Sequence, residues 1–515
     1  MYITEQELRN KILGCWFGKN VGGTLGAPYE WRRQINNVTF YQDSVNGEPL
    51  PNDDLDIQLL WLIAMEQQGI GLSAETLAHY WEIFVTPHWA EYGIAKANMK
   101  LGLIPPLSGS YHNLYKDSCG SYIRSEIWAC VAPGTPALSA ELMLRDSQID
   151  HGGRTEGTYA AVFIAALESA AFVESDIHKL IETGLTYIPA ECDIAKVIRM
   201  VIGAYEAGKT YIEARDMILE AYRGEPFTYF ENGEMVKLVS DRDRALGFDK
   251  GRKGYDVVDN VGLIAVGLLY GEGDFANSML CAINCGEDTD CTAATIGSIF
   301  GIIMGYDNIP EKWKAPIGTG IRTVCLNHGE IEGKVPADIY DLTERTFRLY
   351  RRFELQYPVN LHLGAETGGT SPALACNPYV FDALYRFADC AYHSFTFFDV
   401  AVRYDDGAEW KEGGNAVTLF FVNRYATCEH VEIAWQKKEG ITVDQPVAAV
   451  FLPQDKYGDH IQSAVFHLTA ENPAAVELLT VTVRMTGRVC SAAFTVPFVR
   501  GCGQKAVSVE ARETC

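Results

Sequence analysis

The sequence lacks any long hydrophobic run, and this absence argues against a membrane helix. No stretch approaches the roughly 18 uninterrupted apolar residues that a bilayer span requires. The opening segment, MYITEQELRN, is polar and mixed in charge, without the basic start and apolar core of a signal peptide. We therefore expect a protein of the cytoplasm that makes no membrane contact.

Long basic runs are also missing, which argues against nucleic acid as a partner. The formal net charge is −24, and Lys and Arg occur together only in short groups such as Arg32-Arg33, Arg351-Arg352 and Lys437-Lys438. Binding a phosphate backbone requires basic patches. An acidic chain can hold divalent cations, although net charge alone is a weak indication of a metal site.

The cysteines form neither a disulfide framework nor a zinc motif. The chain has 14 cysteines, none of them in a CxxC pair. Several, such as Cys15, Cys281 and Cys285, lie in apolar helical patterns. Buried reduced thiols that pack as small hydrophobic groups explain this distribution best.

Up to about residue 350 the sequence has the pattern of successive helices. Residues 5–17 are apolar-periodic and lead into a glycine-rich segment, Gly18 to Gly26, which we expect to be a loop. Within residues 291–305, Gly297, Gly301 and Gly305 recur every four residues, which predicts close helix packing. The other predicted helices cover 55–68, 157–173, 258–270, 275–285 and 342–354.

The pattern changes after about residue 375. Short alternating segments separated by turn signals predict about seven strands, a number typical of a β-sandwich. The expected fold class is multidomain, with an all-α domain at 1–355 followed by an all-β sandwich at 356–515 of unknown role. An oligomerisation module, a lid and a carbohydrate-binding domain all stay open for it, so a homo-oligomer stays open too. The predicted strands cover 394–402, 416–422, 430–436, 448–452, 463–468, 476–485 and 490–499.

The first acidic cluster is Asn52-Asp53-Asp54, with Asp56 close behind, at the start of a predicted helix. One aspartate can cap the helix and another can favour its dipole. Further aspartates beside them add like-charge repulsion, which a bound cation would relieve. Taken alone, the cluster is more often structural than metal-binding.

The second acidic cluster is Asp288-Thr289-Asp290, again just before a predicted helix. The plain interpretation is that Asp290 caps the helix. In an extended segment, however, residues i and i+2 point the same way, so both carboxylates would face one side. Hard oxygen clusters of this kind suit Mg²⁺. Two such clusters, both at helix starts, favour a metal site over either one alone.

At these motifs the sequence resembles the ADP-ribosylglycohydrolase superfamily, the group related to dinitrogenase reductase-activating glycohydrolase. The resemblance covers roughly residues 8–345, and its elements occur in the family's order. The motifs that carry it are KILGCWFGKNVGGTLGAPYEW with Glu30, Asn52-Asp53-Asp54, DHGGRTEGTYAAVFIAA with His151, and Asp288-Thr289-Asp290-Cys291, followed by Tyr306, Pro310 and Trp313.

The resemblance implies an all-α fold whose central cleft holds two Mg²⁺ ions. It implies a catalytic role for Glu30, at the mouth of the cleft, and for Asp54 and Asp288. The positions that correspond to the family's metal ligands are Asn52, Asp53, Asp54, Asp288, Asp290 and Cys291.

The sequence departs from the family's pattern at several positions. Asn52 replaces a threonine but keeps an oxygen ligand, whereas Cys291 replaces a threonine with a sulfur that suits Mg²⁺ poorly. The hydroxyl of Thr289 or Thr292 can take over that role. The family's glycine-rich substrate loop is replaced by GSYIRSEIWACVAPG, which places Arg124 and Glu126 where small residues would let the backbone approach the substrate. These changes put ADP-ribosylated protein in doubt as the substrate.

Three further polar positions have both a functional and a structural interpretation. His151 can position the substrate or can be a satisfied core histidine, and Mg²⁺ sites seldom use histidine. Arg124, which together with Glu126 is assigned to substrate binding, can hold a phosphate or form a salt bridge with Glu126 or another acid, and the salt bridge is favoured. Asp259-Asn260, just before a predicted helix at 261–270, is expected to cap that helix, with substrate contact as the alternative.

The predicted function is Mg²⁺-dependent hydrolysis of an N- or O-glycosidic bond in an ADP-ribosyl, ribosyl or related small-molecule sugar substrate. Such cleavage passes through an oxocarbenium-like state that carboxylates stabilise. Two alternatives stay open: a non-catalytic, metal-stabilised protein that binds a ribosyl ligand, and a dinuclear-metal phosphohydrolase.

Overall fold

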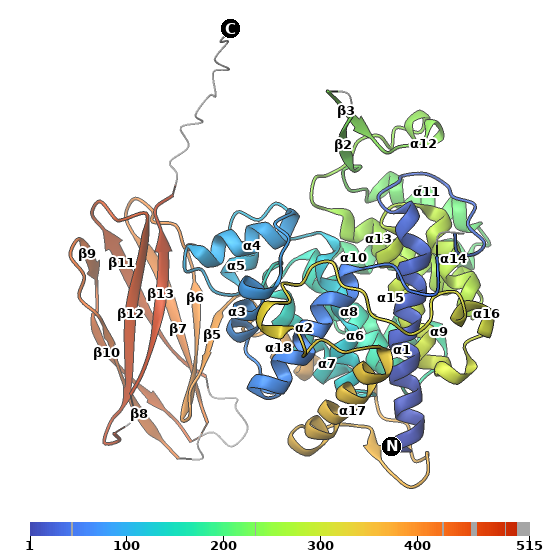
Figure 1. Cartoon of the computed structure of the whole chain (residues 1–515). Coiled ribbons are helices and arrows are strands. Elements are labelled where there is room, and N and C mark those ends of the chain that lie inside the picture. The colour runs from blue at the N-terminus through green and yellow to red at the C-terminus, as the bar shows by residue number, and fades with distance from the viewer. Residues whose placement is uncertain (43–44, 232, 425–426, 455–460, 490, 502–515) are drawn as a thin grey trace. The chain divides into compact units, whose positions relative to one another are not determined.

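The computed structural model describes residues 1–42, 45–231, 233–424, 427–454, 461–489 and 491–501. The chain divides into two compact units, Met1–Ala97 with Ile104–Ala388, and Asn98–Leu103 with Asp389–Cys515. The first unit is helical and the second is built of strands (Figure 1), which confirms the predicted fold class. The domain limits 1–355 and 356–515 stay a prediction.

The helical unit contains the α-helices and the short 3₁₀ segments (η) of the described chain. The α-helices are α1 (Glu5–Gly26), α2 (Asp53–Gln68), α3 (Ala74–Phe84), α4 (Ala90–Lys100), α5 (Leu107–Ser110), α6 (Glu126–Val131), α7 (Pro136–Ser147), α8 (Glu156–Ala171), α9 (Ile177–Leu185), α10 (Asp193–Glu206), α11 (Tyr211–Ala221), α12 (Asp241–Ala245), α13 (Asp256–Tyr270), α14 (Phe275–Cys285), α15 (Thr289–Met304), α16 (Glu311–Lys314), α17 (Ile339–Gln356) and α18 (Pro378–Tyr385). The 3₁₀ segments are η1 (Ala27–Tyr29), η2 (Cys119–Arg124), η3 (Tyr306–Asn308) and η4 (Gly329–Ile331).

The expected loop at Gly18–Gly26 is wrong, because α1 continues through it to Gly26. These glycines are helical and lie against α15, whose backbone approaches them closely. A Cβ added at Gly18 would lie 2.0 Å from the carbonyl oxygen of Gly297, and one at Gly22 would lie 2.1 Å from that of Ala293. Glycine is therefore required here by helix contact rather than by chain reversal. We call this run of backbone contacts the glycine contact.

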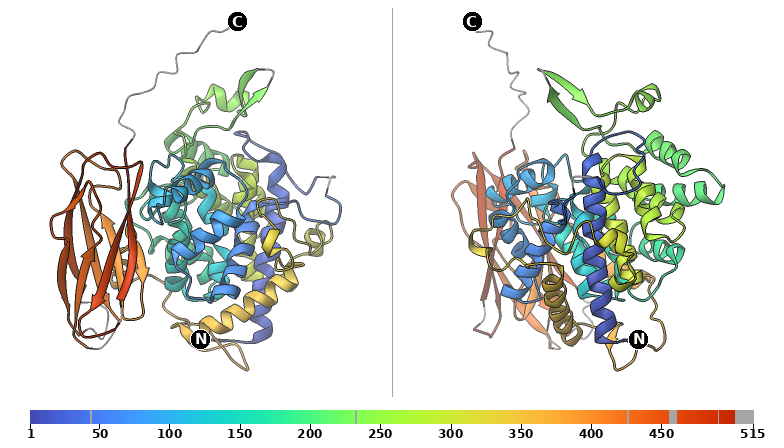
Figure 2. Two further views of the ribbon diagram at one scale, coloured as in Figure 1. Left: turned by 60° about the vertical axis from the view of Figure 1, so that its left-hand side comes forward. Right: turned by 45° about the vertical axis from the view of Figure 1, so that its right-hand side comes forward.

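In the glycine contact, α1 and α15 run antiparallel to each other. Gly14 meets Gly301, Gly18 meets Gly297, and Gly26 meets Thr289, so that the end of α1 lies beside the start of α15. Figure 2 shows the long blue helix α1 alongside the yellow-green helices of the same unit. The predicted packing role of Gly297 and Gly301 is confirmed, whereas Gly305 ends α15 with a φ of 73°.

The second unit is a β-sandwich of two antiparallel sheets. A five-stranded sheet has the order β5-β6-β7-β11-β9, and a four-stranded sheet has the order β10-β8-β12-β13 (Figure 1). The strands are β5 (Ala391–Ser394), β6 (Phe398–Tyr404), β7 (Asn415–Asn423), β8 (Glu429–Trp435), β9 (Ile441–Val443), β10 (Val447–Leu452), β11 (Gln462–Ala470), β12 (Val476–Met485) and β13 (Ser491–Val499). In the helical unit, β1 (Tyr2–Ile3) pairs with β4 (His362–Leu363), and β2 (Thr228–Glu231) pairs with β3 (Glu234–Lys237).

Aromatic contacts between the two sheets form part of the core of the sandwich. Trp435 of β8 lies 5.4 Å from Phe466 of β11, and Tyr404 of β6 lies 5.6 Å from Phe498 of β13 between ring centroids. Each predicted strand overlaps an observed one. The predicted segment 394–402 is divided between β5 and β6, β9 was not predicted, and Cys490 lies outside the described residues.

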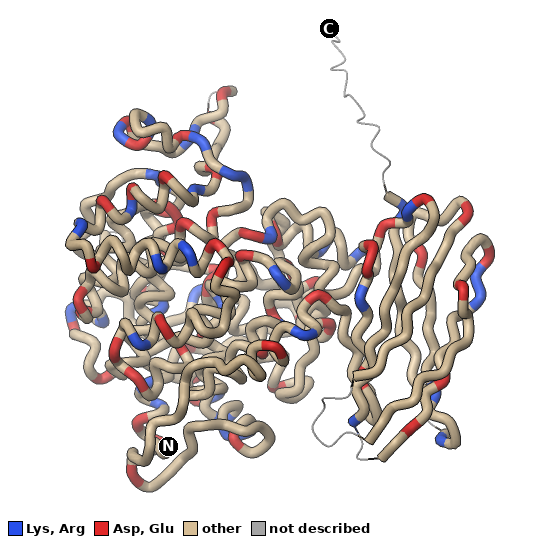
Figure 3. Tube along the Cα trace, turned by 180° about the vertical axis from the view of Figure 1, so that it is seen from behind, with Lys and Arg blue, Asp and Glu red and all other residues tan. Residues whose placement is uncertain are grey.

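Charged residues of both signs are spread over the described parts of both units (Figure 3). Among the described residues, no helix is both long and apolar enough to cross a membrane.

Candidate active site

The first acidic motif begins α2, and its asparagine caps the helix. The Asn52 side chain accepts a hydrogen bond from the backbone N–H of Asp54 at 2.8 Å, which satisfies one of the donors that a helix start leaves open. Asp54 is completely buried, and Asp53 receives a hydrogen bond of 3.3 Å from the Tyr92 hydroxyl. Because Asn52 supplies the cap, neither aspartate is needed for that purpose.

The second acidic motif begins α15, and its carboxylates do not cap the helix. Asp288 occupies the N-cap position without a side-chain capping bond, and Asp290 lies inside the first turn. The structural interpretation of Asp290 as the cap is therefore wrong. The backbone N–H of Asp288 instead donates to the side-chain oxygen of Asn260 on α13, at 3.1 Å.

The glycine contact brings Glu30 to this second motif. Glu30 follows η1 at the end of α1, and α1 ends beside Thr289. The next residue, Trp31, donates its backbone N–H to the carbonyl oxygen of Glu287 at 2.8 Å. The Trp31 side chain also donates a hydrogen bond to the Glu30 carboxylate. These contacts fix Glu30 beside the start of α15.

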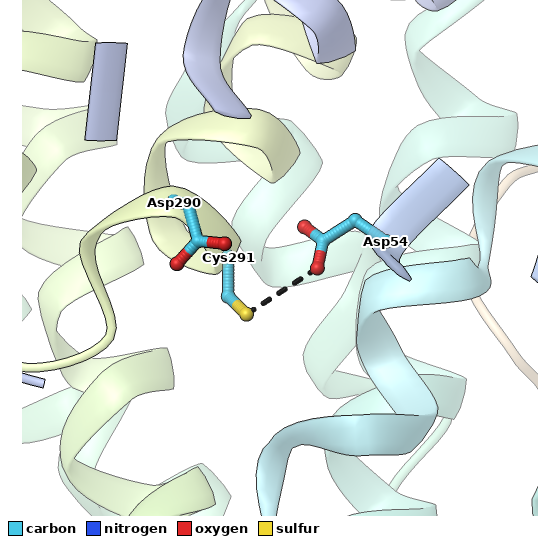
Figure 4. A group of neighbouring side chains, drawn as sticks. All are labelled: Asp54, Asp290 and Cys291. Atoms are coloured by element: carbon cyan, nitrogen blue, oxygen red, sulfur yellow. Dashed lines mark hydrogen bonds between the residues drawn. The ribbon is translucent and has the colours of Figure 1, made fainter. Parts of the chain in front are cut away.

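Two groups of ligand atoms result, and they share Asp290. Asp54, Asp290 and Cys291 form one group (Figure 4), and Glu30, Asp288 and Asp290 form the other. Within each group the ligand atoms all lie within 4.8 Å of one another. Figure 4 shows Asp54 approaching Asp290 and Cys291 from a separate helix. The two acidic motifs therefore converge, as the sequence predicts.

The carboxylates of these groups carry more negative charge than their surroundings neutralise. Burial and the nearby Asp53 carboxylate raise the pKa of Glu30 to about 7. Burial and the Glu30 carboxylate raise the pKa of Asp290 to about 8, and burial with Asp290 raises the pKa of Asp288 well above its ordinary value. Oxygen Oδ1 of Asp288 and of Asp290 is buried without a hydrogen bond in the described chain. Such a set of oxygens fits a divalent cation.

A buried lysine lies on the far side of Asp54. Lys19 of α1 is 2% exposed, and its Nζ lies 2.6 Å from Glu126 Oε1 and 3.7 Å from Asp54 Oδ2. Glu126 also accepts hydrogen bonds from Gln58 and Ser298. This fixed cation orients Asp54 and neutralises Glu126.

Comparison with known proteins gives this arrangement a family. The family model described as ADP-ribosylglycohydrolase matches residues 4–357, which is more than half of the chain. The chain belongs to the ADP-ribosylglycohydrolase family. The matched region contains both acidic motifs, Glu30 and His151.

Two individual proteins are similar to parts of this chain. A segment of 81 residues is 37% identical to the ADP-ribosylarginine hydrolase Tri1 of Serratia proteamaculans (strain 568). It covers 16% of this chain and 20% of that protein, so the chain matches only a small part of its curated relative. A solved chain from an ADP-ribosylglycohydrolase-related protein complex aligns at a TM-score of 0.43 with 17% identity, covering 67% of this chain and 99% of that chain.

The hydroxyls of the two threonines near the family's last ligand position already make hydrogen bonds to the main chain. Thr289 donates its hydroxyl to the carbonyl oxygen of Gly26 at 2.8 Å, and Thr292 donates to that of Thr289 at 3.3 Å. The Cys291 thiol instead donates to Asp54 Oδ1 at 3.4 Å. Asn52 uses its side-chain oxygen for the helix cap, and its Nδ2 lies 2.4 Å from where a Cβ on Gly23 would be. Metal ligation by Asn52 and by Cys291 is a proposal.

Arg124 and Glu126 are fully buried, and both have protein partners. The Arg124 guanidinium donates to Asp146 at 3.0 Å and to both oxygens of Asp150, at 2.7 and 2.9 Å. Glu126 is held by the Lys19 ammonium. These contacts match the salt-bridge interpretation of Arg124, with aspartates as the partners. Substrate binding by either residue stays a prediction.

His151 belongs to the same buried network as Arg124. Its Nδ1 lies 2.9 Å from Asp150 Oδ1, and its Nε2 lies 3.2 Å from the carbonyl oxygen of Ser118. Asp150 and Glu91 raise the pKa of His151, although burial opposes them. His151 is fully buried, as the core interpretation expects, although its Nδ1 makes no hydrogen bond in the described chain. Its role in substrate positioning stays a prediction.

Other acids near the site have structural partners. Asp56 accepts backbone N–H groups of Val324 and Cys325 at 2.7 and 2.6 Å. The prediction that Asp259 caps a helix is wrong, because α13 begins at Asp256 and places Asp259 inside its first turn. The Asp259 side chain accepts from the backbone N–H of Gly224 at 2.8 Å and lies 3.6 Å from Arg33.

Sequence reasoning missed three residues that border the site. Lys19 could have been noticed as a lone cation in the buried stripe of α1, and Trp31 as the aromatic neighbour of Glu30. Tyr122 of η2 gives no signal in the sequence. Its hydroxyl is buried without a hydrogen bond in the described chain, and the nearby Cys119 and Cys291 thiols help burial to raise its pKa.

Proposed function

We propose that this chain is a divalent-metal-dependent hydrolase of an N- or O-glycosidic bond in an ADP-ribosyl, ribosyl or related sugar substrate. The observation that carries the proposal is the convergence of Glu30, Asp288 and Asp290 on one point between α1 and α15. Three carboxylates at such a point have two uses. They hold a cation, and they stabilise the positive charge that develops at an anomeric carbon.

The residues fit a metal ion by their donor set and by their unused oxygens. Glu30, Asp288 and Asp290 offer only carboxylate oxygens, the ligands that Mg²⁺ prefers. Asp54 of α2, which lies in a second group with Asp290 and Cys291, would also help to hold a cation, and Asp53 beside it would add negative charge. A bound cation would orient sugar hydroxyls and increase the acidity of a water molecule there. The presence of two Mg²⁺ ions is part of this proposal.

Glu30 is the proton-transfer group in this scheme. Overall, the bond between the anomeric carbon and the leaving atom breaks, the water oxygen bonds to the anomeric carbon, and the leaving atom gains a proton. A carboxylate at the point where Glu30, Asp288 and Asp290 meet can accept a proton from the attacking water and donate one to the leaving atom. The Trp31 side chain holds the carboxylate by a hydrogen bond. Asp54 and Asp288 are both buried, so their carboxylates have almost no contact with solvent.

The proposal is tested with ribosides and ADP-ribose conjugates in the presence of Mg²⁺. We expect Asp288→Ala to lose several kcal/mol of transition-state stabilisation, roughly a 10³-fold loss of kcat/KM. Asp274→Ala is the matched control, because Asp274 is also a helix-start aspartate but is exposed and caps α14. Its activity should equal that of the wild type.

The products separate this proposal from its alternatives. Release of a free aglycone or base supports glycoside cleavage, whereas release of free phosphate contradicts it and indicates a phosphohydrolase. Binding of the same compounds without turnover, in both the wild type and the control, would identify a non-catalytic binding protein.

A further inference from the structure

The two ligand groups differ in one donor atom. Glu30, Asp288 and Asp290 offer only oxygen, whereas the group of Asp54, Asp290 and Cys291 includes a thiol. Sulfur is a ligand that Mg²⁺ avoids and that Zn²⁺ accepts readily. The two groups share Asp290 and would therefore present different chemistry to a bound cation.

The thiol is held where a ligand would be needed. Cys291 Sγ lies 3.4 Å from Asp54 Oδ1 (Figure 4), and Lys19 lies on the other side, 3.7 Å from Asp54 Oδ2. Lys19 thus leaves Oδ1 facing the sulfur. A tetrahedral cation with bonds of about 2.0 Å to oxygen and 2.3 Å to sulfur places those two atoms about 3.5 Å apart. The observed distance between Cys291 Sγ and Asp54 Oδ1, 3.4 Å, is close to this value.

The neighbouring threonine hydroxyls are committed elsewhere. Thr289 and Thr292 both donate to main-chain carbonyl oxygens, those of Gly26 and Thr289. The sulfur of Cys291 is therefore the side-chain atom of this segment that faces both aspartates.

Two unsatisfied polar atoms in the same pocket point independently to a bound group. Asp290 Oδ1 and the Tyr122 hydroxyl are both buried, and neither has a hydrogen bond in the described chain. Buried polar atoms without partners are costly, and a ligand is one way in which they are satisfied. A cation at the thiol-containing group would bind the carboxylate, and a water bound to that cation could donate a hydrogen bond to the Tyr122 hydroxyl.

We propose that Asp54, Asp290 and Cys291 form a thiophilic half-site that binds a cation of the Zn²⁺ class. The group of Glu30, Asp288 and Asp290 takes a hard cation such as Mg²⁺. This inference rests on the proposed function only in that both place metal in the same pocket. On binding, the Cys291 thiol bonds to the cation as a thiolate, and its proton leaves to solvent.

Cobalt spectroscopy tests the half-site without any substrate. The full-length protein is stripped with a chelator and reloaded with Co²⁺, whose bonds to thiolate give a near-ultraviolet charge-transfer absorption. We expect this absorption in the wild type and its loss in Cys291→Ser. Cys130→Ser is the matched control, because Cys130 is a buried thiol outside both ligand groups, and it should keep the absorption. Circular dichroism checks that each variant is folded.

Competition between metals gives a second readout. Equilibrium dialysis of Cys291→Ser should show Zn²⁺ affinity reduced roughly tenfold or more, with Mg²⁺ affinity unchanged. The inference is overturned if cobalt-loaded wild type lacks the absorption, if Cys291→Ser keeps it, or if Zn²⁺ affinity is equal in the two proteins. Should the absorption appear while no glycoside is cleaved, the half-site stands and the proposed function fails. If the protein cleaves a glycoside in Mg²⁺ but its cobalt form lacks the absorption, the proposed function stands and the half-site fails.

Discussion

Lys19 is the buried charge on which the acidic pocket depends. Its ammonium contacts Glu126 and Asp54, and both attract it strongly enough to raise its pKa despite burial. Glu168 is nearby and also buried. A protein interior tolerates such charges only when each negative group has a positive or hydrogen-bonding partner.

Replacing Lys19 should therefore destabilise the helical unit. We expect Lys19→Met to lower the free energy of unfolding by about 3–5 kcal/mol, since it leaves Glu126 and Asp54 without their cation. Urea unfolding monitored by circular dichroism measures this loss.

A double variant shows whether charge is the cause. Lys19→Met with Glu126→Gln removes one charge of each sign and should recover much of the lost stability. Equal stability of Lys19→Met and wild type would contradict the dependence on Lys19.

At single positions, the sequence predicts those residues whose chemistry is unusual for their location. Asp54, Asp288 and Asp290 could be identified, because acids crowded at a helix start are hard to explain otherwise. Arg124 and His151 could not be placed, because an isolated polar residue has the same pattern in a core as in a site. Their partners Asp146, Asp150 and Glu91 lie in separate helices or at their ends, and only the fold brings them together.

Within the helix pair α1 and α15, we expect the glycine contact to be the feature most sensitive to substitution. A methyl group at Gly18 would lie 2.0 Å from the Gly297 carbonyl oxygen, well inside van der Waals contact. Neither backbone can move without separating the helices along their length.

Gly18→Ala should therefore destabilise the protein by about 3 kcal/mol or more, although alanine favours helix more than glycine does. Gly203→Ala is the matched control, because Gly203 lies within α10 and an added Cβ would meet nothing within 4 Å. That variant should gain about 0.5–1 kcal/mol. The measurement is the thermal unfolding temperature of each variant relative to the wild type. An equal loss of stability in both variants would contradict the role of the contact.

Elements were predicted well where periodicity is strong and poorly where glycine is dense. α14 occupies the residues predicted for it, because apolar spacing and flanking glycines agree. Gly18–Gly26 was expected to be a loop, because a glycine run has the same sequence pattern whether it frees the chain or admits a second helix. The strand β9 has only three residues, too few for an alternating pattern.

At the scale of the whole molecule, the two units should respond to pH in opposite directions. Burial raises the pKa of both Asp56 and Glu91, in the helical unit, to about 7. Their ordinary values are 3.8 and 4.5, so between pH 5 and 7 the folded unit keeps protons that the unfolded chain has released. Stability of this unit therefore falls as the pH rises toward 7.

The stability of the sandwich should change with pH in the opposite direction. Burial lowers the pKa of His393, in β5, from 6.5 to about 4. Below pH 6.5 the unfolded chain binds a proton that the folded sandwich refuses, so stability of the sandwich is lost as the pH falls. Each effect is on the order of 3 kcal/mol across its window.

Hydrogen exchange between pH 5 and 7 measures both units in the same sample. After correction for intrinsic exchange, protection of α2 and α4 should increase toward pH 5, while protection of β5 and β6 should decrease. His393→Phe should abolish the change in the strands and leave that in the helices. A parallel change in both units would contradict this prediction.

The backbone of Gly26 lies against that of Thr289, at the start of the helix that carries Asp290 and four residues before Glu30. The distance between Glu30 and Asp288 is therefore set by contact between two backbones. A Cβ at Gly26 would lie 2.2 Å from the Thr289 carbonyl oxygen and would increase that distance. Inserting one residue into α1 would turn everything beyond it by about 100° and carry Glu30 out of alignment. Single acidic side chains can therefore change without altering the helix pair, whereas a change in the length of α1 requires a matching change in α15.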